Sequence, residues 1–88
     1  MDEKAFTALK TKLDEVHVWP CLYVFKFIVK KEQTPEVEAL FKKGAPFERR
    51  DSKGGKYVGM TAQVLMDTSA EVISVYREAV KINGCIAL

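Results

Sequence analysis

The sequence contains very little histidine and cysteine, and this shortage limits its chemistry. His17 is its only histidine, and its two cysteines, Cys21 and Cys85, are far apart in the chain. The chain therefore has too few histidine and cysteine residues to favour a zinc cluster or a Cys–His nucleophilic pair. Small secreted domains usually carry a larger, even set of cysteines. We accordingly expect two reduced thiols, no catalytic residue, no metal and no cofactor.

Long apolar runs and a strong net charge are also missing. The longest apolar stretch, residues 20–29, is interrupted by Lys26 and is too short to cross a bilayer as a helix. The N-terminus lacks the basic start and apolar run of a signal peptide. The net charge of +2 is well below that of a typical nucleic-acid-binding protein. These absences predict a cytoplasmic protein without membrane contact, for which nucleic acid is not the favoured partner.

The remaining composition suits one small folded domain. Hydrophobic residues make up 48% of the 88 residues, enough for a core, and charged residues make up 30%, enough for a solvated surface. We therefore expect a single domain over residues 1–88, in which residues 2–16 are an added N-terminal helix.

The apolar stretch at residues 20–29 predicts the central strand of the fold. It is rich in aromatic and β-branched residues, and the two sides of its alternation are both apolar. One side carries Tyr23, Phe25, Phe27 and Val29, and the other carries Leu22, Val24 and Ile28. Strands that are apolar on both sides are typical of the middle of a sheet. We expect this strand to be covered on both faces.

Three stretches have the pattern of helices. Residues 2–16 carry apolar side chains at helical spacing, namely Phe6, Leu9, Leu13 and Val16. A second helix is predicted to begin with Thr34 as its N-cap and Pro35 at its first position, to run through Lys42 and Lys43, and to stop at Gly44. A third follows the capping box of Thr68 and Glu71 and runs to about residue 82, with its inward side chains at Val72, Ile73, Tyr76, Ala79 and Val80.

Three further stretches are predicted strands. Residues 47–52 are heavily charged, residues 85–88 are apolar, and residues 57–66 alternate with a core face of Val58, Met60, Ala62, Val64 and Met66. Gly54 and Gly55 predict a two-residue hairpin turn between the strands at 47–52 and 57–66, because both central positions of such a turn need a positive φ. Between the first helix and the first strand, Pro20 ends the helix and Trp19 is expected to close one end of the core.

The order of these elements predicts an α+β fold of the ferredoxin-like βαββαβ type. It has a four-stranded antiparallel sheet, two helices on one face and an extra N-terminal helix. Leu22, Val24 and Ile28, joined by Leu65, would lie on the face away from the two helices. Such a patch needs a cover. We expect the N-terminal helix or the second subunit of a homodimer to cover it and to protect the uncharged last strand.

The order and spacing of several short segments match a known family. These segments are residues 12–15, 19–20, 23–27, 52–54 with Tyr57, 75–77 and 86–88. In them the chain resembles the YbeD-like family, small bacterial proteins of unassigned biochemical function. The resemblance implies an ACT-like, regulatory version of the ferredoxin-like fold, and it carries the label of a lipoate-binding protein. The turn before Tyr57 is one residue longer than is usual in the family, and the helix from Pro35 is shorter.

These observations favour a non-enzymatic regulatory or interaction module that binds a small-molecule effector or a protein partner. Ligands of such folds often lie at the loop after the first strand, against a neighbouring subunit. In this chain the corresponding residues are Lys31, Glu32, Gln33 and Thr34.

Two alternatives remain open. The predicted hairpin is basic at Arg49, Arg50, Lys53 and Lys56, so with Tyr57 it could contact the phosphates of a nucleic acid. RNA-binding domains of this fold stack bases on aromatic residues of the first and third strands, and the third strand offers only Tyr57. A solvated hairpin is therefore the favoured explanation. The other alternative is an accessory protein that binds no small ligand.

Overall fold

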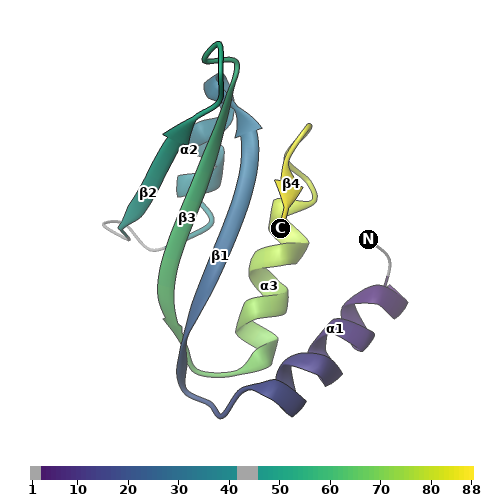
Figure 1. Ribbon diagram of the computed structural model, residues 1–88. Helices are drawn as coiled ribbons and strands as arrows, with labels where there is room; N and C mark the ends of the chain where they lie inside the picture. The colour runs from purple at the N-terminus through teal and green to yellow at the C-terminus, as the bar shows by residue number, and fades with distance from the viewer. Residues whose placement is uncertain (1–2, 42–45) are drawn as a thin grey trace.

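The computed structural model describes residues 3–41 and 46–88. Over these residues the fold is α+β, with three α-helices and a four-stranded antiparallel sheet, as the sequence predicts (Figure 1). The elements are α1 (Glu3–Val16), β1 (Cys21–Lys30), the 3-10 turn η1 (Lys31–Gln33), α2 (Thr34–Glu38), β2 (Phe47–Asp51), β3 (Tyr57–Met66), α3 (Ser69–Ala79) and β4 (Ile86–Ala87).

The strands lie side by side in the order β2-β3-β1-β4, and all three neighbouring pairs are antiparallel. The apolar strand β1 is therefore central, as predicted, and all ten of its residues pair with β3. The charged strand β2 lies at one edge, where its side chains discourage pairing with another sheet. The short strand β4 lies at the other edge, and the N–H of Leu88 extends its ladder by donating to the carbonyl of Lys26 (2.8 Å).

The core lies between one face of the sheet and the helices α2 and α3. Phe25, Phe27 and Val29 of β1 are at most 1% exposed. They pack in one cluster with Val58, Met60 and Ala62 of β3, Val37 and Phe41 of the α2 region, and Val72, Ile73 and Tyr76 of α3. Period-two alternation thus identifies the core face of both central strands correctly. Trp19 packs at the rim of this cluster, as predicted, and its Nε1 donates to Asp14 Oδ1 (3.0 Å).

The opposite face of the sheet is uncovered, which corrects the expectation that β1 is covered on both sides. Leu22 is 59% exposed, Val24 44% and Leu65 59%. The N-terminal helix is not their cover, because α1 packs against α3, beside the sheet (Figure 1). There Phe6 and Leu13 are buried. Val16, which was expected to face inward, is exposed because α1 has reached its end at this residue.

The helix boundaries differ from the predicted ones at both ends of the second helix and at the end of the third. Gln33 rather than Thr34 occupies the N-cap of α2, and the Thr34 hydroxyl donates to the carbonyl of Lys31 (3.2 Å). The 3-10 turn η1 has already begun the helical path, so Thr34 lies inside it. Helix α2 ends at Glu38, earlier than predicted, and residues 39–41 are no longer helical. The predicted last turn at Lys42 and Lys43 and the stop at Gly44 lie outside the described residues. Helix α3 ends at Ala79, which leaves the following Val80 exposed rather than inward-facing.

Local signals around α3 and the β2–β3 loop are largely confirmed. The Thr68 hydroxyl accepts from the N–H of Glu71 (3.3 Å), and the Glu71 carboxylate accepts from the N–H of Asp67 (3.0 Å). Gly54 and Gly55 have positive φ, as predicted. The loop is nevertheless longer than two residues, because the N–H of Ser52 bonds to the carbonyl of Tyr57 and closes the hairpin around residues 53–56.

Candidate functional site: the open face of the sheet

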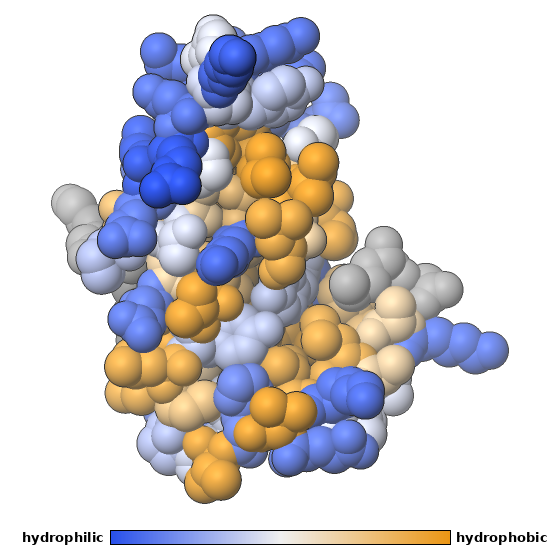
Figure 2. All heavy atoms as spheres, viewed as in Figure 1, coloured by the Kyte–Doolittle hydropathy of each residue, from blue (hydrophilic) through white to orange (hydrophobic). Residues whose placement is uncertain are grey.

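The uncovered side of the sheet, here called the open face, is organised in rows across the strands. Residues paired across an antiparallel ladder point to the same side. The strand register therefore gives five rows: Lys30–Tyr57, then Ile86–Ile28–Gly59–Arg50, then Lys26–Thr61–Glu48, then Val24–Gln63, and finally Leu22–Leu65. Figure 2 shows apolar side chains in separate areas of the molecular surface, with polar side chains between them and at the end that carries the β2–β3 loop.

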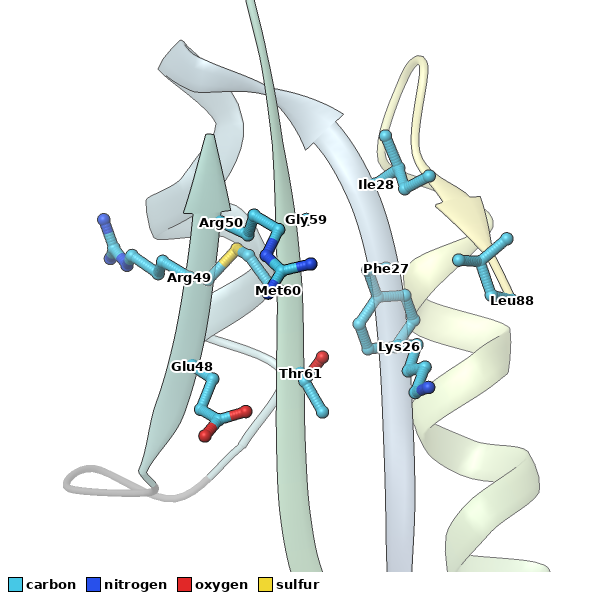
Figure 3. A pocket seen from close by; sticks show the side chains of 10 residues that line it. All are labelled: Lys26, Phe27, Ile28, Glu48, Arg49, Arg50, Gly59, Met60, Thr61 and Leu88. Atoms are coloured by element: carbon cyan, nitrogen blue, oxygen red, sulfur yellow. The ribbon is translucent and has the colours of Figure 1, made fainter. Parts of the chain in front are cut away.

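Two shallow depressions follow these rows. The larger, of about 540 Å³, is lined by Lys26, Phe27, Ile28, Glu48, Arg49, Arg50, Gly59, Met60, Thr61 and Leu88 (Figure 3). The smaller, of about 350 Å³, is lined by Val24, Pro46, Phe47, Glu48, Thr61 and Gln63. Both depressions include Glu48 and Thr61, so they adjoin each other over the centre of the open face.

Gly59 forms part of the floor of the larger depression. A Cβ atom at this position would lie 3.7 Å from the carbonyl oxygen of Arg50, which is ordinary van der Waals contact. Neither backbone conformation nor lack of space requires a glycine here. A glycine inside a strand often marks a place where a ligand or another chain approaches closely.

Four charged side chains lie on the open face without a partner on the face itself. Lys26, Lys30, Glu48 and Arg50 are exposed, and their side chains form no ion pair with another described residue. Lys26 and Glu48 flank Thr61, so two strand spacings of about 5 Å each separate their backbones. The open face is thus a mixed apolar and charged surface rather than a purely apolar one.

The predicted ligand loop and the tip of the hairpin meet at one end of the molecule. The N–H of Lys31 donates to the carbonyl of Lys56 (3.3 Å), and Lys56 Nζ lies 5.9 Å from the centre of the Tyr57 ring. Lys31, Lys56 and Tyr57 are therefore brought together, and Lys53 lies in the adjoining loop. Glu32 is exposed, whereas Thr34 is buried and its hydroxyl is already bonded.

Gln33 lies on the helical side, away from the open face. It lines a hollow of about 680 Å³ between the α2 region and the end of α3, together with Glu36, Ala39, Leu40, Glu78, Lys81, Ile82 and Asn83. Its buried Oε1 has no hydrogen-bond partner among the described residues. The predicted loop residues 31–34 therefore do not converge on one site.

The structure divides the predicted basic hairpin. Arg49 and Arg50 are neighbours on β2 and point to opposite sides of the sheet (Figure 3). Arg49 forms an ion pair with Glu38 of α2, while Arg50 lines the open face. Adjacent residues of a strand alternate in direction, so the four basic residues do not form one continuous phosphate-binding surface.

The aromatic residues of β1 are also absent from the open face. Tyr23, Phe25 and Phe27 point into the core, where Phe25 lies 4.7 Å from Tyr23 and 5.6 Å from Tyr76 between ring centres. In the described part of β3, Tyr57 is the one aromatic side chain, and it is 38% exposed. The stacking surface that RNA-binding domains use on these two strands is therefore not formed.

The cysteines have the environment of structural thiols. Cys21 and Cys85 are both free in the structure. Burial raises the pKa of Cys85 above its ordinary value, which lowers its thiolate fraction near neutral pH and with it its reactivity. Among residues 3–41 and 46–88, no group of three or more His, Cys, Asp or Glu side chains could hold a metal ion. No helix in this part of the chain is long and apolar enough to cross a membrane.

A hydrogen bond between two tyrosines links β1 to α3 behind the open face. The hydroxyls of Tyr23 and Tyr76 are 3.1 Å apart. Burial raises the pKa of Tyr76 well above its ordinary value of 10.0, and the bond with Tyr23 raises it further. Above about pH 10 the unfolded chain releases the Tyr76 proton while the folded protein retains it. The contribution of Tyr76 to stability is therefore complete below that pH and is lost as the pH rises through the folded pKa.

The variant Tyr76→Phe should show directly how the ionisation of Tyr76 changes the stability with pH. At neutral pH we expect a loss of about 1 kcal/mol, because the Tyr23 hydroxyl loses its partner. Between about pH 10 and pH 12 the stability of the variant should fall less steeply than that of the wild type. Urea unfolding at a series of pH values measures both effects. The exposed Tyr57→Phe is the control that keeps the wild-type slope; identical slopes for all three proteins would contradict the prediction.

Comparison with known families assigns the chain to one of them. A family model described as "Protein of unknown function (DUF493)" matches residues 14–86. The chain belongs to the DUF493 family. This confirms the family recognised from the short segments, since the YbeD-like resemblance is consistent with DUF493. The DUF493 match includes β1, β2, β3 and α3 entirely and leaves out most of α1. Neither the comparison with curated proteins nor that with solved structures found a match.

The rows of the open face are the feature that sequence reasoning missed. The predicted site residues lie at the loop after β1 and in the hairpin, whereas the depressions lie on the open face of the sheet and include only Arg49 and Arg50 of those residues. Lys26, Glu48 and Gly59 were not among the predicted site residues. Their alternation with core residues along each strand was a usable signal, but their assembly into rows depends on strand register, which the sequence does not state.

Proposed function

We propose that this protein is a small non-enzymatic regulatory or interaction module that receives its partner on the open face. The observation that carries the proposal is the exposure of Leu22, Val24 and Leu65 on the two central strands. Apolar clusters of this kind on a soluble protein commonly mark interaction sites. Gly59, farther along the same face, lets a partner approach the backbone closely.

We also propose that the fold is the ferredoxin-like arrangement in its ACT-like, regulatory version. Two findings support this assignment. Counted from the β4 edge, the strand order is β4-β1-β3-β2, in which β1 and β3 are central. Without α1, the elements follow the sequence strand, helix, strand, strand, helix, strand. Lipoate binding stays an expectation that follows from the family resemblance alone.

A photocrosslinking experiment tests the proposed surface for small and macromolecular partners alike. A benzophenone amino acid replaces Leu65 on the open face, and in a matched variant it replaces Glu78, which is exposed on α3. After irradiation in the cells that naturally produce the protein, intact mass and gel mobility report both kinds of adduct. We expect an adduct of defined mass at position 65 and none at 78. No adduct at position 65, or equal labelling at the two positions, would rule out the open face as the binding surface.

A further inference from the structure

We propose that the occupant of the open face is a second copy of this chain, packed face to face about a two-fold axis that runs along β3. This inference rests on the proposed function and identifies the partner. Its central contact is an exchanged pair of charges: Lys26 of each copy meets Glu48 of the other.

The row Lys26–Thr61–Glu48 is positive on β1, neutral on β3 and negative on β2. A two-fold axis that runs parallel to the strands above Thr61 places β1 of each copy over β2 of the other, and β3 over β3. It therefore places Lys26 over Glu48 of the second copy and Glu48 over Lys26 of the second copy. Such an isologous contact makes each pair twice. It also supplies partners for two charged side chains that form no ion pair with any described residue of their own chain.

The neighbouring rows are compatible with the same axis. In the row above, Ile28 comes to lie over the aliphatic part of Arg50 of the second copy, beside the glycine floor. In the row below, Val24 comes to lie over the smaller depression, which Pro46 and Gln63 line. In the last row, Leu65 on the axis meets Leu65 of the second copy. No row places two like charges opposite each other.

The other two-fold arrangement of facing sheets lacks this complementarity. An axis in the same plane but perpendicular to the strands places each strand over the same strand of the second copy. Passing through the row of Thr61, it sets Lys26 over Lys26 and Glu48 over Glu48. Like charges opposed in an interface cost several kcal/mol. The charges of the open face therefore favour the axis along β3, for which facing strands run in nearly the same direction, as in aligned sheet packing.

The size of the face predicts a weak dimer. An axis along β3 overlaps β1, β3 and β2 of the two copies and leaves β4 outside the contact. At about 3.3 Å per residue and 4.8 Å per strand, the ten-residue length of β1 and three strands give at most about 33 by 14 Å, or about 480 Å² per copy. Two copies then bury at most about 950 Å² in total, which is below the range of standard interfaces. We expect dissociation constants in the micromolar range, because the burial of an area of this size leaves little net binding free energy after the entropic cost of association.

Charge exchange followed by sedimentation equilibrium tests the contact. The wild type, at concentrations from about 10 µM to 1 mM, should pass from monomer to dimer. Lys26→Glu and Glu48→Lys should each raise the dissociation constant at least about tenfold, because each places like charges together twice. An equimolar mixture of the two variants should recover dimers of wild-type affinity, because every Glu then faces a Lys. Lys53→Glu, an equal charge change in the loop, should leave the affinity unchanged.

Each result supports or overturns the exchange of Lys26 and Glu48 between two copies. Recovery in the mixture, and in the double variant Lys26→Glu with Glu48→Lys, supports the exchanged pair. A wild type that stays monomeric at the highest concentration overturns the second copy as occupant. So does a dimer whose affinity none of these variants changes. These two results leave the proposed function to the crosslinking experiment, in which an adduct of twice the chain mass at position 65 signals a second copy and any other defined mass signals a different partner.

Discussion

Replacement of Phe25 by alanine is expected to lower the free energy of unfolding by about 3–5 kcal/mol. The Phe25 side chain is 0% exposed. Its ring centre lies 4.7 Å from that of Tyr23, 5.0 Å from that of Phe41 and 5.6 Å from that of Tyr76. Removing the ring loses its transfer free energy and leaves a cavity between β1, the α2 region and α3, which rigid neighbours cannot close.

This loss is a large part of what holds a small domain together. Single domains are stable by only about 5–15 kcal/mol, and one of this size belongs to the lower half of that range. Phe25→Ala is therefore expected to be partly unfolded at 37 °C, as urea denaturation and thermal unfolding would show.

The matched control is the neighbouring residue. Val24→Ala changes a side chain of the same strand that is 44% exposed and points to the open face. It should cost less than about 1 kcal/mol, because much of the side chain is already in water. Equal losses for the two variants would contradict the assignment of alternate faces on β1.

Replacement of Phe6 by alanine has the second-largest expected effect, about 3 kcal/mol. Phe6 is 5% exposed, and the guanidinium of Arg77 lies 4.7 Å from the centre of its ring. Arg77 in turn forms an ion pair with Glu3, and this pair lowers the pKa of Glu3 through their hydrogen bonds. The variant loses the buried ring and the cation–π contact that connect α1 with α3.

Urea unfolding and amide hydrogen exchange together measure this effect. The amides of α1 should exchange faster in Phe6→Ala, because α1 contacts the rest of the protein mainly through α3. Thr7→Ala is the control: its exposed hydroxyl donates within α1, to the carbonyl of Glu3 (3.0 Å), so the stability should change by less than about 0.5 kcal/mol. Unchanged exchange in α1 would show that Phe6 does not hold the helix in place.

Much of the local structure could be read from the residues alone. The alternation in β3 identified Val58, Met60 and Ala62 as core residues, because successive side chains of a strand point to opposite sides. The capping box placed the start of α3 correctly, because its hydrogen bonds join residues that are close in sequence. The end of the same helix was predicted too late, since Val80 is apolar and nothing in its type shows that it is exposed.

The candidate site was harder to predict. Their adjacency in sequence predicts a basic cluster of Arg49 and Arg50, whereas in the strand their side chains point to opposite faces. In the sequence Lys26 interrupts the apolar stretch at residues 20–29, yet its importance depends on Thr61 and Glu48, which come from other strands. Register is a non-local property, because a shift by one residue exchanges the two faces of a strand.

The sequence by itself determined which side chains share a face of each strand and helix. Backbone geometry fixes these periods within a few residues. The tertiary structure alone decided which of those faces is covered. Leu22 and Phe25 are both apolar residues of β1, and α1 is amphipathic whichever surface it meets. The choice depends on how segments far apart in the chain pack together: α1 covers α3, and the side of the sheet that carries Leu22 remains open to a partner.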